Sequence, residues 1–181
     1  MELAGRYIFA AFTICCFVLN PSIFFTQWDN LTHDFSVDNH PREEYRSIWS
    51  GWSGLSYVVV AFAPGNKLHL VWVCQGVASF LADYVYIGLP SASHGVDRWL
   101  SMFCTLHVVY CAQKYRLWRR FVFGCFITLL TQYFARLSFG KGWSNHWIFF
   151  HTLWHLTGGY ICYKVYADCH YIKSSKSKAI H

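Results

Sequence analysis

Two histidines in the last apolar stretch of the chain have the spacing of a metal-binding pair. His151 and His155 lie four residues apart within the stretch Asn145–Tyr166, so on a helix they share one face. That geometry allows two imidazoles to bind one metal ion. At about 1.5 Å per residue, the pair lies roughly 10–15 Å from the start of the helix. The spacing therefore predicts two ligands of one metal site.

Two carboxylates are candidates to complete this site. Seven of the nine acidic residues lie in the termini or the first loop, which leaves Asp83 and Asp97 within or at the edge of apolar stretches of membrane-spanning length. A carboxylate in a bilayer is costly unless it is paired, so such residues are functional candidates by default. Asp83 falls at a depth similar to that of the histidines, and we predict it as the third ligand. The structural alternatives are a buried hydrogen bond for Asp83 and, for Asp97, pairing with Arg98 at a helix N-terminus.

Three further polar residues are candidates for the site or its surroundings. Ser79 precedes Asp83 by one helical turn; it either allows two helices to approach closely or acts beside the metal. His94 precedes Asp97 and is an alternative to Asp83 as the third ligand. His107 lies far along its stretch from these residues, so we expect it to serve packing or hydrogen bonding.

The elements that must position these residues are membrane-spanning helices. The sequence is 55% hydrophobic and only 13% charged, whereas soluble domains carry about 25% charged residues. Its apolar runs reach the roughly 20 residues that cross a bilayer. We predict one domain, an all-α polytopic bundle of about six helices. The expected spans are Tyr7–Phe25, Tyr45–Phe62, Leu68–Ile87, Val96–Gln113, Leu117–Phe134 and Asn145–Tyr166.

The net charge of +6 does not indicate nucleic-acid binding. The basic residues gather in the connection 114–120 and in the tail beyond residue 164, beside apolar spans, which is typical of cytoplasmic loops. Both ends of the chain, including the tail 168–181, are then expected in the cytoplasm. The loop 26–46 is expected outside it, with Asn30 in a glycosylation sequon. The first span is alternatively a signal peptide, although it lacks a small-residue cleavage pattern.

The eight cysteines do not suggest a disulfide framework or a thiolate zinc site. Nearly all of them lie inside the apolar stretches, and no CxxC pair occurs. Cysteines in such positions behave as small hydrophobic residues.

The last stretch resembles the final helix of the alkaline ceramidases, which carries HxxWH. Here it reads Phe150-His151-Thr152-Leu153-Trp154-His155-Leu156-Thr157-Gly158-Gly159. These enzymes belong to a superfamily that includes the adiponectin and progestin receptors. Its members carry a serine, a histidine four residues later, an aspartate at the next helix and a final HxxxH. Ser79, Asp97, His151 and His155 match in order, whereas Asp83 replaces the histidine, and six expected helices stand against the superfamily's seven.

The resemblance implies a zinc-dependent hydrolase that cleaves the amide bond of ceramide or a related membrane lipid. It implies Zn²⁺ bound by Asp83, His151 and His155. The catalytic residues are then Asp97, as proton acceptor, and Ser79, as stabiliser of the oxyanion. A membrane of the endoplasmic reticulum or Golgi is the expected location. The alternatives are a receptor-like protein or an inactive one with a structural zinc site.

Overall fold

The computed structural model describes residues 43–89 and 91–178, and this part of the chain is helical without strands. The predicted span Tyr7–Phe25 and the sequon at Asn30 lie outside the described residues. The helices, in order, are the 3₁₀ turn Glu43–Tyr45, α3 (Ile48–Gly54), α4 (Ser56–Ala61), α5 (His69–Phe80), the π-helical turn Leu81–Val85, α6 (Ala92–Lys114), α7 (Trp118–Gly140) and α8 (Ser144–Lys178). The all-α prediction is confirmed for these residues.

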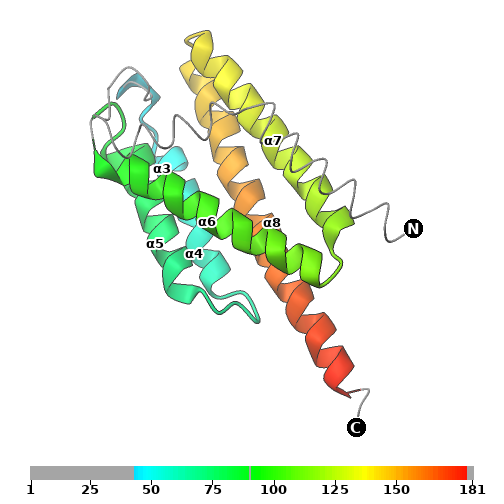
Figure 1. Ribbon diagram of the computed structural model, residues 1–181. Helices are drawn as coiled ribbons and strands as arrows, with labels where there is room; N and C mark the ends of the chain where they lie inside the picture. The colour runs from blue at the N-terminus through cyan, green and yellow to red at the C-terminus, as the bar shows by residue number, and fades with distance from the viewer. Residues whose placement is uncertain (1–42, 90, 179–181) are drawn as a thin grey trace.

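Helix α8 is the element around which the others are arranged. Figure 1 shows α7 running beside α8, and the short turn between them makes the pair antiparallel. On its other side α8 contacts α3, α4 and α6, and α5 packs against α3, α4 and α6. Residues on α8 therefore face two different layers of helices.

Two separate apolar clusters hold the helices together. The larger one contains the buried side chains of Trp72, Val108 and Val165. The smaller one contains Tyr45 and Trp147, near the start of α8. His151 and His155 lie on α8 between the residues of these two clusters, so the candidate site is enclosed by apolar packing at both ends.

The predicted span Tyr45–Phe62 is interrupted where α3 meets α4. Helix α3 ends at Gly54 and α4 begins at Ser56. A Cβ atom at Gly54 would lie 2.8 Å from Ser79 Oγ, so only glycine permits this approach of α3 to α5. The Ser56 hydroxyl donates to the carbonyl oxygen of His155 at 3.1 Å. The interruption thus follows from contacts with α5 and α8.

The later helices extend beyond the predicted spans. Helix α6 begins at Ala92, where the Ser91 hydroxyl accepts a hydrogen bond from the Ser93 amide at 3.2 Å, a typical N-cap contact. Helix α7 continues to Gly140 and α8 to Lys178. Much of the predicted tail 168–181 is therefore an extension of α8.

Helix α7 is the one described helix that is long and apolar enough to cross a membrane by length and composition, with a mean hydropathy of 1.3. Helices α3, α4 and α5 are shorter, and the polar residues of the candidate site, such as His155 on α8 and Asp97 on α6, reduce the apolar character of the other long helices. One helix of the described part therefore has the length and composition to cross a membrane, and the six-span bundle is not established.

Candidate metal centre

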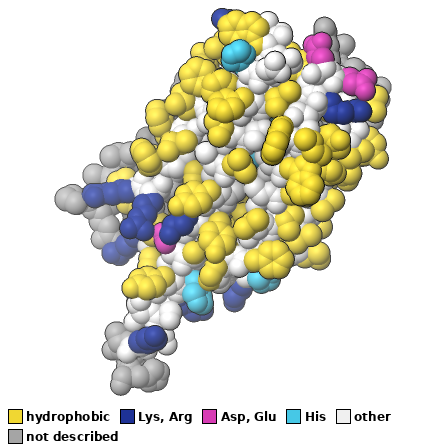
Figure 2. Space-filling view, turned by 180° about the vertical axis from the view of Figure 1, so that it is seen from behind, with side chains coloured by type: hydrophobic (Ala, Val, Ile, Leu, Met, Phe, Trp, Pro, Cys, Tyr) yellow, Lys and Arg dark blue, Asp and Glu magenta, His cyan; other side chains and the backbone are white. Residues whose placement is uncertain are grey.

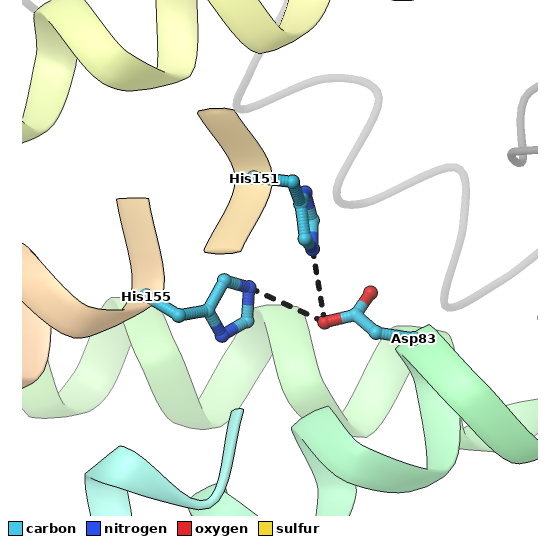
Figure 3. Close-up of side chains that lie close together, drawn as sticks. All are labelled: Asp83, His151 and His155. Carbon is cyan, nitrogen blue, oxygen red and sulfur yellow. Dashed lines mark ion pairs between the residues drawn. The ribbon is translucent and has the colours of Figure 1, made fainter. Parts of the chain in front are cut away.

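Asp83, His151 and His155 converge on one point inside the helical bundle (Figure 3). The Oδ2 atom of Asp83 lies 3.2 Å from the Nε2 atom of each histidine. The side chains of Asp83, His151 and His155 are 16%, 10% and 2% exposed. One carboxylate and two imidazoles therefore share a site that is almost closed to the surroundings.

These distances fit a metal ion held between the three side chains. Two ligand atoms at about 2.1 Å from a tetrahedral metal lie about 3.4 Å apart. The three ligand atoms lie within 4.8 Å of one another. Both Nε2 atoms are buried, and each lies next to Oδ2 of Asp83, to which a ring nitrogen can donate only when it carries a proton. A bound cation would satisfy both of them.

Helix α8 positions the two imidazoles through its regular geometry. His151 and His155 are one helical turn apart, and their ring centroids lie 4.6 Å apart. The ring of His151 stacks on Trp147 at 4.3 Å with an interplanar angle of 23°. Trp154 meets the ring of His155 edge-on at 4.8 Å. This aromatic packing restricts the rotamers of both histidines.

Asp83 comes from the π-helical turn that ends the α5 segment. The amide of Tyr86 donates to the carbonyl oxygen of Leu81 at 2.8 Å, which is the i to i−5 bond of a π-turn. Such turns occur mostly as single insertions in α-helices and frequently at functional sites. The wider turn directs the carboxylate of Asp83 toward α8.

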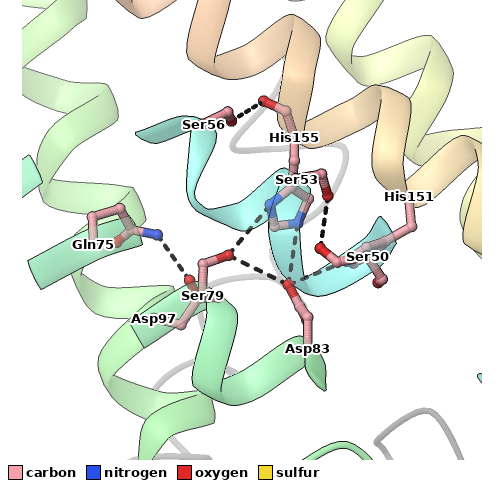
Figure 4. Close-up of polar contacts among 9 residues, drawn as sticks. All are labelled: Ser50, Ser53, Ser56, Gln75, Ser79, Asp83, Asp97, His151 and His155. Atoms are coloured by element: carbon pink, nitrogen blue, oxygen red, sulfur yellow. Dashed lines mark hydrogen bonds and ion pairs between the residues drawn. The ribbon is translucent and has the colours of Figure 1, made fainter. Parts of the chain in front are cut away.

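Ser79 connects two of the candidate ligands (Figure 4). Its hydroxyl donates to Asp83 Oδ2 at 3.3 Å and lies 3.3 Å from Nδ1 of His155. Because the hydroxyl has a single hydrogen, His155 must donate from Nδ1 when the hydroxyl donates to Asp83. Nε2 of His155 then keeps its lone pair for a metal. The side chain is 0% exposed, so Ser79 acts on the ligands and their orientation.

Asp97 joins the cluster from α6. Its Oδ1 atom accepts a hydrogen bond from Nε2 of Gln75 at 2.8 Å. It does not belong to the group whose atoms can share one metal. The structure therefore places Asp97 beside the candidate ligands, on the side of α5 that carries Ser79 (Figure 4).

The alternative third ligand, His94, lies elsewhere. Its Nε2 atom lies 3.2 Å from the carbonyl oxygens of Tyr86 and Leu89. It therefore pairs with the backbone that links the π-turn to α6, and Asp83 is the residue that reaches the two histidines. His107 lies 2.6 Å from the hydroxyl of Tyr166, in agreement with the hydrogen-bonding role expected for it.

The sequence reasoning missed several polar residues around the site. Gln75 orients Asp97, the Ser56 hydroxyl holds the backbone of His155, and Ser50 is fully buried with no hydrogen bond from its hydroxyl within the described residues. The signal was present in the sequence, because a glutamine inside an apolar span is costly and small residues recur at helix interfaces. The serines of α3 and α4 lie at such interfaces.

Comparisons of the chain with protein-family models, with curated proteins and with solved structures found no match.

Proposed function

We propose that this protein is a zinc-dependent hydrolase of the membrane that cleaves the amide bond of ceramide or a related acyl lipid. The observation that carries the proposal is the buried convergence of Asp83, His151 and His155, at 3.2 Å from the carboxylate oxygen to each ring nitrogen. Two residues suited to proton transfer and ligand orientation, Asp97 and Ser79, lie beside it.

The choice of zinc follows from the type and number of the ligands. Two imidazole nitrogens and one carboxylate oxygen form a known set for catalytic zinc, and three protein ligands leave one position open. Structural zinc sites are usually closed by four protein ligands. The described residues that group within metal-binding distance are Asp83, His151 and His155, which fits the open type.

The reaction needs a nucleophile and a proton carrier. Asp83, His151 and His155 would hold a zinc ion, which when bound would make a water molecule acidic enough to act as a nucleophile near neutral pH. We assign to the carboxylate of Asp97, which accepts a hydrogen bond from Gln75, the transfer of a proton from the nucleophile to the leaving amine, which is general acid–base catalysis. Ser79 keeps His155 and Asp83 in their orientations.

A lipid substrate fits the surface of the molecule. Large apolar side chains are exposed on several helices; for example, Phe62 on the α4 side is 76% exposed, Leu70 on α5 is 74% exposed and Phe123 on α7 is 67% exposed. Figure 2 shows hydrophobic side chains over much of one face. Soluble monomers rarely expose large contiguous apolar patches. We therefore propose that several of these helices, and not α7 alone, lie in the bilayer.

A groove beside the site offers a route for the lipid. It has a volume of about 290 Å³ and is lined by Trp49 on α3 and by Ile148, Phe149 and Thr152 on α8, among others. Thr152 directly follows His151 in the chain, and its hydroxyl is buried without a hydrogen bond within the described residues. We propose that the groove holds the apolar part of the substrate beside the helix that carries both histidines.

The rival function is a receptor-like or inactive protein with a structural zinc. The burial of the two histidines favours it, because His151 is 8% and His155 is 2% exposed. A substrate carbonyl needs access to the metal, whereas a structural ion does not. The two functions make different predictions for turnover at full zinc occupancy.

The deciding experiment combines metal analysis with lipid turnover. Protein purified in lipid nanodiscs should contain one zinc per chain by elemental analysis and should release fatty acid from ceramide in a mass-spectrometric assay. His151→Ala should lose the metal and the activity. The matched control is His146→Ala, which changes an exposed histidine of the same helix and should retain both. Full zinc occupancy without turnover of ceramides, acylated lipids or lysolipids would establish the receptor-like reading.

A further inference from the structure

A second groove lies between α7 and α8, away from the metal centre. It has a volume of about 260 Å³, and its apolar lining includes Phe121, Ile127 and Ile161. Along α8 it extends from Thr157 to Asp168, which is about 16 Å at 1.5 Å per residue. That length is close to half of the roughly 30 Å hydrocarbon core of a bilayer. The groove therefore matches the thickness of one leaflet.

The groove ends in a cluster of three charged side chains. Asp168 Oδ2 accepts from Arg120 Nη1 at 3.0 Å, and Asp168 Oδ1 accepts from Lys164 Nζ at 3.2 Å. The Arg120 and Lys164 side chains are 77% and 46% exposed, whereas that of Asp168 is only 20% exposed. The carboxylate thus lies beneath the two cations and holds them together at the surface.

This arrangement leaves hydrogen-bond donors available for an anion. Arg120 uses one of its five N–H groups on Asp168 and Lys164 uses one of three, and both side chains suit phosphate oxygens. The three charges sum to +1. On the face shown in Figure 2, Lys and Arg side chains gather around one acidic side chain, bordered by hydrophobic side chains.

The place of the cluster in the chain indicates which membrane surface it faces. It adjoins the connection between α6 and α7. Arg116 lies in that connection, Lys114 ends α6, and Arg119 lies in the first turn of α7. Basic connections lie on the cytoplasmic side of membranes, where anionic lipids are concentrated. Basic pockets between membrane helices on that side bind anionic headgroups.

We propose that the α7–α8 groove binds one anionic phospholipid of the cytoplasmic leaflet. Its phosphate contacts Arg120 and Lys164, and one acyl chain lies along the apolar part of the groove beside Ile127 and Ile161. The site is distinct from the metal centre, because Lys164 lies nine residues beyond His155, or about 13 Å along α8.

Native mass spectrometry of the full chain tests this proposal without any use of the hydrolase activity. The protein is reconstituted with equal amounts of phosphatidylglycerol and phosphatidylcholine, extracted into detergent, and scored for retained lipid. We expect phosphatidylglycerol to be retained about tenfold or more over phosphatidylcholine, since two cations each contribute to headgroup binding. The double variant Arg120→Gln/Lys164→Gln should lose this preference.

The matched control is the double variant Lys114→Gln/Arg119→Gln, which removes two charges from the same end of the bundle outside the groove. It should keep the preference, and both variants should show unchanged helicity and monodispersity. Excess inorganic phosphate should not displace the lipid, because the acyl chain anchors it. Equal retention of both lipids would overturn the proposal, and so would the absence of retained lipid, which is expected if another part of the chain fills the groove. Displacement of the lipid by phosphate would also overturn it. So would equal losses of the lipid preference in the two double variants.

Discussion

Replacing Ser79 with alanine removes the one hydroxyl that contacts both a candidate histidine ligand and the candidate carboxylate ligand. In Ser79→Ala, Nδ1 of His155 loses a partner at 3.3 Å in a site where the histidine is 2% exposed. Leaving a buried polar group unpaired costs about 1–3 kcal/mol. Loss of a residue that orients a metal ligand typically lowers metal affinity by about 10–100-fold, or about 1.4–2.8 kcal/mol. The two values agree, so we expect zinc affinity to fall within this range.

The assay is competition for zinc between the purified protein and a chromophoric chelator. Ser53→Ala is the matched control, because the buried Ser53 hydroxyl donates to the carbonyl oxygen of Ser50 at 2.7 Å. Figure 4 draws no hydrogen bond from it to a candidate ligand. It should leave the zinc affinity unchanged. If Ser79→Ala binds zinc as tightly as the unmodified protein but loses turnover, Ser79 acts on the substrate oxyanion. That result would refute the positioning role derived from its contacts.

Three further predictions address the proton carrier, the helix packing and the metal. Asp97→Asn should abolish turnover with zinc retained, because the amide oxygen still accepts from Gln75; loss of zinc, measured by elemental analysis, would make Asp97 a ligand. Gly54→Ala should destabilise the protein by about 1–3 kcal/mol in a thermal unfolding assay, since the added Cβ would lie 2.8 Å from Ser79 Oγ. The control is Gly140→Ala, whose added Cβ would have no atom within 4 Å and should not destabilise the protein. Chelation should lower the melting temperature by about 5–10 °C, and added zinc should restore it; an unchanged value contradicts a site linked to folding.

The parts of the site that follow from local helix geometry could be predicted from the sequence. The spacing of His151 and His155 fixes their common face once the segment is helical, and no tertiary contact is needed to infer it. Asp83 was grouped with the two histidines because it lies at a similar depth in its apolar stretch, and the structure brings these three side chains together. The choice between Asp83 and His94 was harder, because it depends on backbone carbonyls that the sequence does not reveal as partners.

The parts that depend on contacts between helices could not be predicted. The π-turn at Leu81–Val85 leaves no sequence signal, and it sets the direction of the Asp83 carboxylate. The interruption at Gly54 arises from its approach to Ser79 on α5, which is 25 residues away in the chain. Hydrophobic patterns report which residues are buried, but they do not report which neighbour buries them.

The charge of the site argues for a cation independently of any resemblance. Asp83 is 16% exposed, and its ion pairs among the described residues are with His151 and His155. With both imidazoles neutral, as metal binding requires, the carboxylate keeps an uncompensated charge, and burying such a charge is costly. One protonated imidazole would balance the carboxylate, but its proton would occupy a nitrogen lone pair that faces Asp83. A divalent cation would balance the carboxylate and take both nitrogen lone pairs, leaving one positive charge for a bound anion such as hydroxide, so the three side chains suit a metal ion.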